Sequence, residues 1–295
     1  MSIYGIDFGT TFSCISKLDN YGMPVIIKNI RDASDKLASV VYFESADSVV
    51  VGIDAKDMKE TDGDRVVDYV KREIGKPNYY VFDGKTYTPV EISALILKRL
   101  KDMAEEQGEV VNDVVITIPV YFGYQEKHAI LDACTIAGLN VLEVIPEPIA
   151  ATLYYCGVRN KEEKTIMVYN LGGYTFDVTL LKMTAGEDVH QRINVLATGD
   201  SDHLGGMDWD HILYNYLEEA FCTDNGLFPE KLEPETRQHI RAKVEDTKLK
   251  LSSLESVKVT IAVNGFLPGC LSGVKSLSRQ QQDLYSRQWI MLNMF

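Results

Sequence analysis

The strongest constraint on this chain is a five-residue pattern that occurs twice, near the start and again past the midpoint. Each copy has an apolar residue, Asp or Asn, an apolar residue, Gly and a small residue, between apolar runs typical of β-strands. The copies are Ile6-Asp7-Phe8-Gly9-Thr10 and Tyr169-Asn170-Leu171-Gly172-Gly173. Two such hairpins predict two similar halves that face each other across a phosphate group, as in a duplicated nucleotide clamp.

The first copy also contains the residue types that suit a phosphate and its divalent ion. Gly9 can adopt φ > 0 and lets backbone N–H groups approach a ligand. The hydroxyls of Thr10 and Thr11 are hydrogen-bond donors, and Asp7 adds a carboxylate. A single copy is equally typical of an ordinary β-hairpin with a glycine turn. The nucleotide interpretation therefore depends on the repeat.

The composition argues against some classes of partner. Of the 295 residues, 45% are hydrophobic, which is enough for the cores of two domains or of one large domain. The formal net charge is -13 and the sequence pI is about 4.9. A field of this sign repels phosphate backbones, so we expect neither nucleic acid nor an anionic membrane as a partner. No apolar stretch reaches membrane-spanning length.

The cysteines and the start of the chain favour a reducing, cytoplasmic location. Five cysteines form no Cys-x-x-Cys pair and are odd in number, so we expect thiols that serve as small core residues. The first strand is predicted to begin at Ile3, which leaves no room for a signal peptide. The five histidines lack metal-ligand spacing and are expected at the surface or in the core.

Apolar strands alternate with helical patterns along the first half, which predicts an α/β fold. The segment Thr88-Pro89-Val90-Glu91 gives an N-cap, Pro at N1 and Glu at N3, a strong helix start. Residues 114–118 predict a fully apolar strand. The apolar positions of residues 65–74 predict a helix that Gly75 ends. This helix carries Lys71, and a lysine in such a place is ordinarily solvated.

Glu147 follows a predicted strand over residues 141–145 and begins a short helix over residues 149–155. The local pattern leaves two interpretations open. A carboxylate at a helix start often only complements the helix dipole. The carboxyl end of a strand is also where α/β folds place groups that face a ligand.

The last third has weaker signals. Gly205-Gly206 before a predicted helix is a weak phosphate or sugar signal and is more often only a helix cap. A longer helix is predicted over residues 235–254, and three of its polar positions share one face: Glu245, Lys248 and Ser252. Such a face is also typical of a solvated surface with an ion pair. The apolar end, residues 289–295, is expected either to pack as a terminal helix or to mark the loss of a following segment.

These motifs together resemble the nucleotide-binding domain of the seventy-kilodalton heat-shock (DnaK-type) chaperones, in the actin and sugar-kinase superfamily of ATPases. They occur in family order from the N-terminus to about Ser253. Besides the two glycine hairpins, the matching motifs are Val70-Lys71-Arg72-Glu73-Ile74-Gly75, Val115-Ile116-Thr117-Ile118-Pro119, Pro146-Glu147-Pro148, Leu204-Gly205-Gly206-Met207-Asp208 and Lys248-Leu249-Lys250-Leu251-Ser252.

The resemblance implies an α/β, actin-like ATPase fold with duplicated ribonuclease-H-like lobes around a nucleotide cleft, the second lobe incomplete. Lobe I would span residues 1–160, with its base at 1–38 and 92–160 and an inserted subdomain at 39–91. Lobe II would span residues 161–295, with its base at 161–203, an upper subdomain at 204–275 and a truncated return segment at 276–295. Ser276-Leu277-Ser278-Arg279 resembles the start of the returning helix, and no substrate-binding domain is expected.

The resemblance also implies roles for residues around the phosphates. The phosphates would be held on one side by Gly9, Thr10, Thr11 and Phe12, and on the other side by Gly172, Gly173, Tyr174 and Thr175. Lys71 would reach the γ-phosphate and the attacking water, and Glu147 would help to orient that water or the hydration shell of the metal ion. Asp7 and Asn170 would hold Mg²⁺ through its waters, with K⁺ as a further candidate ion. The implied catalytic set is Asp7, Lys71, Glu147, Asn170 and Thr175.

The remaining implied contacts are with adenosine and with partner proteins. The expected adenosine-side residues are Gly205, Gly206, Glu245, Lys248, Leu249 and Ser252. The cofactors implied are ATP or ADP with Mg²⁺. The partners implied are those of a stress-response chaperone in protein folding, namely a J-domain protein and a nucleotide exchange factor.

Three departures from the family pattern bear on activity. Asn170 stands where the family has Asp, so one charge beside Mg²⁺ is lost. Tyr174 replaces a glycine, which predicts a strained or reshaped loop. Leu249 replaces an arginine that stacks on adenine. The sequence therefore predicts a domain that binds ATP or ADP with Mg²⁺ and hydrolyses ATP weakly. The alternative is a non-hydrolysing nucleotide-binding or partner-binding remnant of the family, and a sugar kinase is a distant third.

Overall fold

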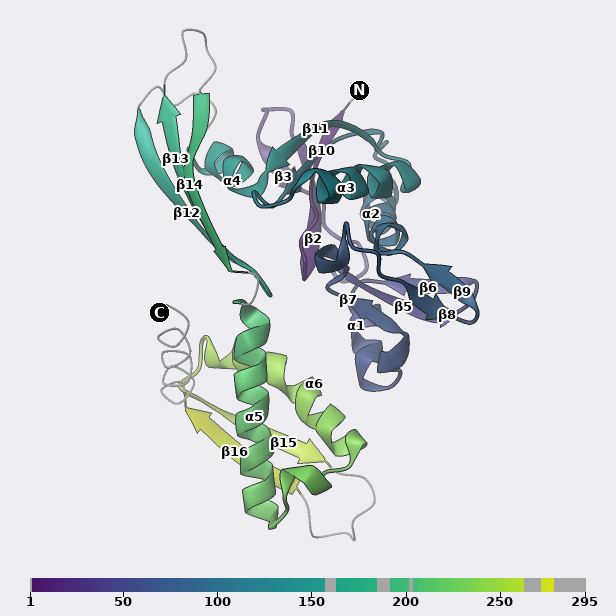
Figure 1. Cartoon of the computed structure of the whole chain (residues 1–295), viewed down its shortest axis with the longest axis vertical. Coiled ribbons are helices and arrows are strands. Elements are labelled where there is room, and N and C mark those ends of the chain that lie inside the picture. The colour runs from purple at the N-terminus through teal and green to yellow at the C-terminus, as the bar shows by residue number, and fades with distance from the viewer. Residues whose placement is uncertain (1, 157–162, 185–191, 202–203, 263–271, 279–295) are drawn as a thin grey trace. The chain divides into compact units, whose positions relative to one another are not determined.

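The computed structural model describes residues 2–156, 163–184, 192–201, 204–262 and 272–278. Contacts within the chain divide it into two compact units, Met1–Asp202 and His203–Phe295. Figure 1 labels the helices and strands of both units. The predicted division into lobes at residue 160 stays a prediction.

The main sheet of the first unit has the strand order β11-β10-β1-β2-β3, with β4 paired to β2. Strands β1, β10 and β11 are parallel neighbours, whereas β1, β2 and β3 run antiparallel. Its strands are β1 (Ile3–Asp7), β2 (Phe12–Leu18), β3 (Pro24–Ile26), β4 (Leu37–Ala38), β10 (Asp113–Ile118) and β11 (Asn140–Pro146). Alternate side chains of β1, including Tyr4 and Ile6, are buried, as the period of two in a strand requires.

Helices α2 (Pro89–Glu105) and α3 (Tyr124–Ile136) contribute buried side chains to the core that includes this sheet. The predicted start of α2 is confirmed. The Thr88 hydroxyl accepts from the Glu91 N–H at 3.2 Å, and the Glu91 carboxylate accepts from the Thr88 N–H at 2.8 Å. This capping box satisfies two of the free N–H groups at the helix start. The expected short helix after the strand is α4 (Glu147–Cys156).

An insertion between β4 and α2 forms two small sheets. One has the order β6-β5-β7 and the other is the β8–β9 hairpin. The elements are β5 (Val40–Ser45), β6 (Ser48–Val51), α1 (Ile53–Asp57), η1 (Met58–Glu60), η2 (Gly63–Arg65), β7 (Val66–Asp68), η3 (Val70–Glu73), β8 (Tyr80–Phe82) and β9 (Lys85–Tyr87), where η marks a 3-10 helix.

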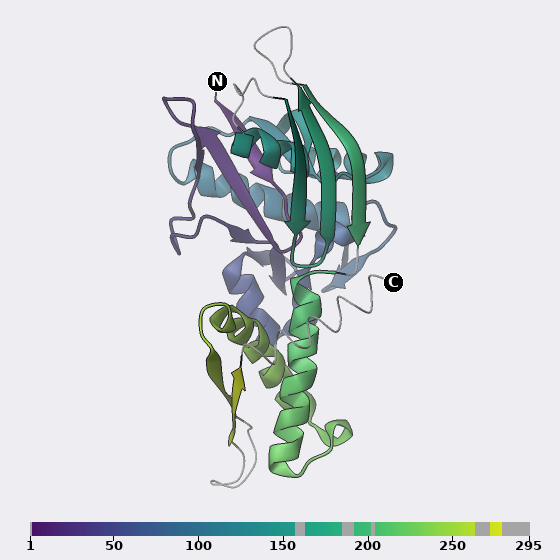
Figure 2. The same cartoon turned by 90° about the vertical axis from the view of Figure 1, so that its left-hand side faces the viewer.

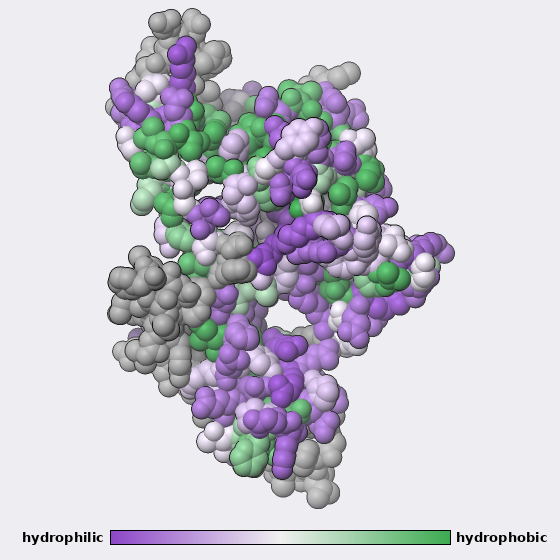
Figure 3. Space-filling view, in the orientation of Figure 1, coloured by the Kyte–Doolittle hydropathy of each residue, from purple (hydrophilic) through white to green (hydrophobic). Residues whose placement is uncertain are grey.

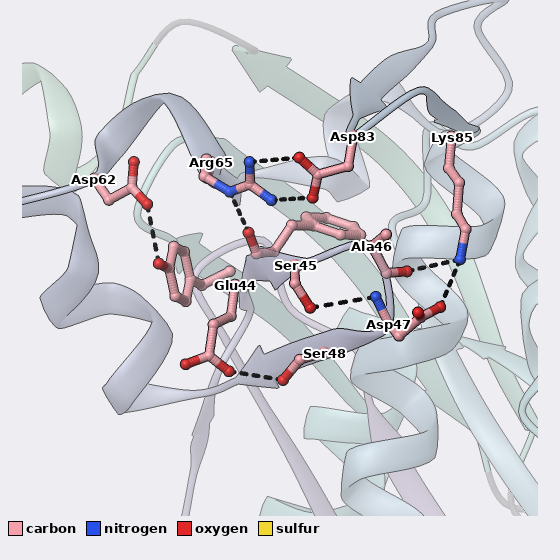
Figure 4. Close-up of polar contacts among 11 residues, drawn as sticks. Glu44, Ser45, Ala46, Asp47, Ser48, Asp62, Arg65, Asp83 and Lys85 are labelled. Carbon is pink, nitrogen blue, oxygen red and sulfur yellow. Dashed lines mark hydrogen bonds and ion pairs between the residues drawn. The ribbon is translucent and has the colours of Figure 1, made fainter.

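Polar contacts tie these hairpins together, as Figure 4 shows. The Arg65 guanidinium donates to both carboxylate oxygens of Asp83, at 3.0 and 2.5 Å, and also to the Phe43 carbonyl. Lys85 binds the Ala46 carbonyl and the Asp47 carboxylate, each at 2.8 Å. One arginine thus joins strand β5 to the turn of the β8–β9 hairpin.

The predicted helix over residues 65–74 is wrong. Residues 66–68 form strand β7, which pairs with β5. Tyr69 then adopts left-handed backbone with φ 54°, which an α-helix does not allow. Only Val70–Glu73 is helical, as a single 3-10 segment. Gly75 ends this region at φ 81°, in the left-handed region that favours glycine.

A second hairpin with a third strand completes the described part of the first unit. Strands β12 (Lys164–Leu171), β13 (Phe176–Thr184) and β14 (Arg192–Ser201) form an antiparallel sheet in this order, and Figure 2 shows them side by side. Hydrophobic residues are visible over this sheet in Figure 3. Among the exposed apolar side chains of the sheet is that of Met167, at 65% exposure.

The two glycine hairpins have the same register. Asp7 pairs with Cys14 across β1 and β2, and Asn170 pairs with Asp177 across β12 and β13. The paired residues are equally spaced along the chain in both copies. The internal repeat seen in the sequence is therefore also a structural repeat.

The second unit packs two long helices against a hairpin. Its described elements are α5 (Gly206–Asn225), η4 (Pro229–Lys231), α6 (Pro234–Leu251), β15 (Ser256–Ala262) and β16 (Ser272–Ser278). The residues expected to begin a returning helix, Ser276–Ser278, instead end strand β16, which pairs with β15. The rest of the predicted return segment, including the apolar end at 289–295, lies outside the described residues.

No helix in the described ranges combines the length and apolar character that crossing a bilayer requires.

Candidate functional site

The first corner, residues 7–12, joins β1 to β2 and is fixed by two serines. The Gly9 N–H donates to the Ser13 hydroxyl at 3.1 Å, and the Ser39 hydroxyl donates to the Gly9 carbonyl at 2.8 Å. The two buried hydroxyls lie 2.9 Å apart. Gly9 does not use the left-handed backbone expected for it. Glycine is required for another reason, because a Cβ there would lie 2.1 Å from the Phe12 carbonyl oxygen.

The second corner, residues 170–175, joins β12 to β13 and contacts the first. Its turn is closed by the Gly172 N–H, which donates to the Thr175 carbonyl at 2.8 Å. A Cβ on Gly173 would lie 2.0 Å from Oγ1 of Thr11. Only a residue without a side chain therefore lets the two corners approach this closely.

The Thr11 hydroxyl is buried at this contact and has no hydrogen-bond partner among the described residues. A buried polar group of this kind is costly unless a ligand or water satisfies it. Thr10 and Phe12, the other predicted phosphate-side residues, are partly buried beside it. The role of these residues toward a phosphate group stays a prediction.

Lys71 lies on η3 and is buried, with its side chain only 5% exposed. Its ammonium donates to Oε1 of Glu147 at 2.7 Å, and it lies 5.8 Å from the ring centroids of Phe8 and Phe122. The solvated position that is ordinary for a lysine is therefore not the one observed. Burying an ammonium requires a partner of opposite charge, which Glu147 supplies.

Glu147, the first residue of α4, connects the lysine to the second corner. Its Oε2 accepts a hydrogen bond from Nδ2 of Asn170 at 3.3 Å. Three of the five predicted catalytic residues thus form one hydrogen-bonded line, from Lys71 through Glu147 to Asn170. The fourth, Asp7, is exposed and accepts from the Thr117 hydroxyl at 2.7 Å. The fifth, Thr175, closes the second corner through its carbonyl.

Two acidic residues near this line were missed in the sequence. Asp177 pairs in register with Asn170 on one side and with Asp200 on the other. Partial burial raises the pKa of Asp177 to about 6, with further increases from the charges of Glu147 and Asp200 and an opposing effect from Lys71. The signal was available, because alternation along β13 places Asp177 opposite Asn170 whenever the hairpin is closed by this turn.

In the part of the chain that the structure describes, no three His, Cys, Asp or Glu side chains are grouped so as to hold a metal ion. The predicted role of Asp7 and Asn170 toward Mg²⁺, through its waters, stays a prediction.

Tyr174, the departure in the second corner, is not strained, since its φ lies outside the left-handed region. Its ring packs instead against the segment that carries Lys71. The Arg72 guanidinium carbon lies 3.2 Å from the centroid of the Tyr174 ring. Of the predicted strain or reshaping, the backbone of Tyr174 therefore shows no left-handed strain, and its side chain packs against Arg72.

The six predicted adenosine-side residues belong to the second unit. Lys248 on α6 donates to the Gly206 carbonyl at 3.0 Å and forms an ion pair with Asp210 at 2.6 Å. The Gly205 N–H donates to the Asp208 carboxylate at 2.7 Å, which caps α5. On α6, Leu249 and Ser252 are exposed and Glu245 is partly buried. Their role toward a nucleotide stays a prediction.

Comparison with known families gives a match that covers most of the chain. The family model described as "Hsp70 protein" matches residues 3–81 and 78–288. The matched ranges contain both corners, Lys71, Glu147 and all six residues of the second unit discussed above.

Proposed function

This chain belongs to the Hsp70 family of chaperones, and we propose that its first unit binds the phosphates of ATP and ADP with Mg²⁺ and hydrolyses ATP slowly. The family match confirms the resemblance drawn from the motifs and, with it, the actin-like ATPase fold class. The proposal concerns what this chain's own residues do, which family membership alone does not decide.

One observation supports the proposal above the others: the hydrogen-bonded line from Lys71 through Glu147 to Asn170. It brings a buried ammonium, a carboxylate and the second corner together from three separate segments. Phosphoryl transfer to water needs such groups, because its catalysis consists mainly of positioning and charge neutralisation. An ion pair that served only for stability would not need the contact with a glycine corner.

The residues have distinct roles in the proposed reaction. The Thr10 and Thr11 hydroxyls and the backbone N–H groups of both corners donate to phosphate oxygens. Lys71 neutralises charge that develops on the transferred group. Glu147 accepts a hydrogen bond from the attacking water and aligns it. Mg²⁺, when bound with the nucleotide, neutralises further phosphate charge.

Asn170 is the reason that we expect slow hydrolysis of ATP. Its amide donates to Glu147, whereas an aspartate at this position would repel Glu147 and Asp177 and would attract a hydrated cation. The neutral amide therefore satisfies the ligand-free site without a metal ion. This contact favours the second candidate function, a nucleotide-binding module of the family that does not hydrolyse ATP.

Calorimetric titration with ATP and ADP, with and without Mg²⁺, tests binding, and single-turnover hydrolysis of ATP separates the two candidates. Asn170→Asp is expected to raise the single-turnover rate about tenfold or more, the scale of one well-placed group that stabilises a transition state. The same change should destabilise the ligand-free protein, and Mg²⁺ should reverse that loss. Lys71→Met serves as the inactive control.

A measurable rate in the unaltered chain supports the ATPase. Binding without any turnover, and no gain from Asn170→Asp, supports the non-hydrolysing module. If neither the unaltered chain nor the Asn170→Asp variant binds ATP or ADP, both candidate functions are contradicted.

We propose that a J-domain protein and a nucleotide exchange factor bind this chain, and that it acts in the cytoplasm. The four cysteines among the described residues, Cys14, Cys134, Cys156 and Cys222, are all free thiols, which is consistent with a reducing compartment.

A further inference from the structure

Tyr174 lies in a cluster of two neighbouring tyrosine rings with a cation against each, which we call the stack. The Arg72 guanidinium carbon is 3.2 Å from the Tyr174 ring centroid, and the Tyr69 ring centroid is 5.8 Å from it. The Lys59 ammonium in turn lies 5.4 Å from the Tyr69 ring. A guanidinium over a tyrosine face is attracted by the ring's quadrupole, more strongly where water is partly excluded. All three partners of the stack come from the inserted region, and Tyr174 alone comes from the second corner.

Two members of the stack flank the buried lysine. Tyr69 precedes η3 in a left-handed conformation that residues other than glycine adopt rarely, and Arg72 immediately follows Lys71. The contacts of Tyr69 and Arg72 therefore restrain the backbone before and after Lys71.

The stack closes a ring of contacts. From the second corner, Tyr174 contacts Arg72 directly. From the same corner, Asn170 reaches the neighbouring Lys71 through Glu147. Two separate connections thus join one short corner to one short 3-10 helix. Loosening either connection is expected to weaken the other, because both restrain the same two segments.

We propose that Tyr174 is a positioning residue, whose ring fixes the second corner to the η3 segment and so holds Lys71 and Glu147 in place before ATP arrives. Where the family has a flexible glycine, this chain has a tyrosine whose ring contacts Arg72 and Tyr69. We call this contact the latch. Its effect on ATP rests on the proposed function, whereas the latch itself is a property of the ligand-free protein. The ligand class concerned is a nucleoside triphosphate, since the group that Lys71 is proposed to neutralise is the γ-phosphate.

Hydrogen–deuterium exchange of the ligand-free full-length chain tests the latch without any nucleotide. The Gly172 amide is the reporter, because it closes the corner through its bond to Thr175. Tyr174→Leu keeps an apolar side chain but removes the ring, so exchange at Gly172 should speed up about tenfold, which corresponds to ~1.4 kcal/mol. Tyr174→Phe keeps the ring and should retain protection. Tyr155→Leu, which alters a tyrosine that is 89% exposed, is the matched control and should change nothing at Gly172.

Single-turnover kinetics test the effect on positioning. Tyr174→Leu should lower the ATP rate about tenfold and change ADP affinity less than about twofold, because ADP lacks the γ-phosphate that the misplaced Lys71 would otherwise neutralise. Tyr174→Phe should restore the rate. Circular dichroism melting of each variant identifies any loss of folding, and the Phe variant then still decides between ring and hydroxyl.

Each part of the inference has its own contradicting result. Unchanged Gly172 exchange in Tyr174→Leu overturns the latch. Faster exchange with an unchanged ATP rate overturns the positioning role. Failure of the unaltered chain to bind ATP would contradict the proposed function and the positioning role, whereas the exchange result would still decide whether the latch exists.

Discussion

The carboxyl group of Asp177 should oppose folding at neutral pH, and replacing it with an amide should stabilise the ligand-free protein. Burial, together with the nearby charges of Glu147 and Asp200, raises its pKa from 3.8 to about 6. An acid whose pKa is higher in the folded state binds its proton more tightly there than in the unfolded chain. The contribution of this carboxyl group to the free energy of unfolding is therefore fully favourable below pH 3.8, and it is lost as the pH rises through about 6.

The size of this effect follows from the shift. A shift of about two pKa units corresponds to at most ~3 kcal/mol. The Asp177 side chain is only half-buried, and solvent screens its charge, so about 1–2 kcal/mol is the expected value. Asp177→Asn keeps the shape and removes the charge. The variant should be more stable than the unaltered protein by that amount at pH 7.5 and by about half as much at pH 5.

Urea-induced unfolding at pH 5.0, 6.0 and 7.5, followed by circular dichroism, measures the difference. Asp132→Asn, which alters an exposed aspartate of α3, is the matched control and should show no comparable pH-dependent gain. The reasoning is refuted if Asp177→Asn destabilises the protein at pH 7.5, or if its gain does not depend on pH. Either result would mean that Asp177 is already neutralised or hydrated in the folded chain.

Two further predictions test the packing of the first unit. Gly173→Ala places a methyl group 2.0 Å from Oγ1 of Thr11, and overpacking of this kind should lower the stability by ~1–3 kcal/mol; thermal unfolding should show that Thr11→Ala partly rescues it. Arg65→Lys removes the two-pronged contact with Asp83 and the bond to the Phe43 carbonyl. Limited proteolysis should then cleave the β8–β9 hairpin faster than in the unaltered chain, and equal rates would show that the guanidinium does not hold the hairpin.

Elements whose signals are local could be predicted from the sequence. The start of α2 depends on residues 88–91 alone, and the capping box forms as expected. Strand β10 is a short, largely apolar run that pairs with β1, and its alternate residues Val114, Ile116 and Ile118 are buried. The glycine repeat gave the two corners, because both copies need the same strand–turn–strand geometry.

Features that depend on tertiary contacts could not be predicted in this way. The apolar spacing of residues 65–74 fits a helix, but pairing of β7 with β5 and the left-handed Tyr69 override it. Glycine at position 9 was expected for its φ angle, whereas the structure requires it for the approach of the Phe12 carbonyl. Such a contact involves the path of the chain after the turn, which the pentapeptide does not contain.

The two departures in the second corner are best understood together. An aspartate at position 170 would leave a carboxylate beside Glu147 that a hydrated cation could neutralise, and a glycine at position 174 would leave a loop that a ligand could order. Asn170 avoids the extra carboxylate and instead donates a hydrogen bond to Glu147. Tyr174 orders the loop through its contact with Arg72. A site that is already ordered loses less conformational freedom when its ligand arrives. The same contacts keep Lys71 in place, so this corner favours a fixed site over one that is assembled by its ligand.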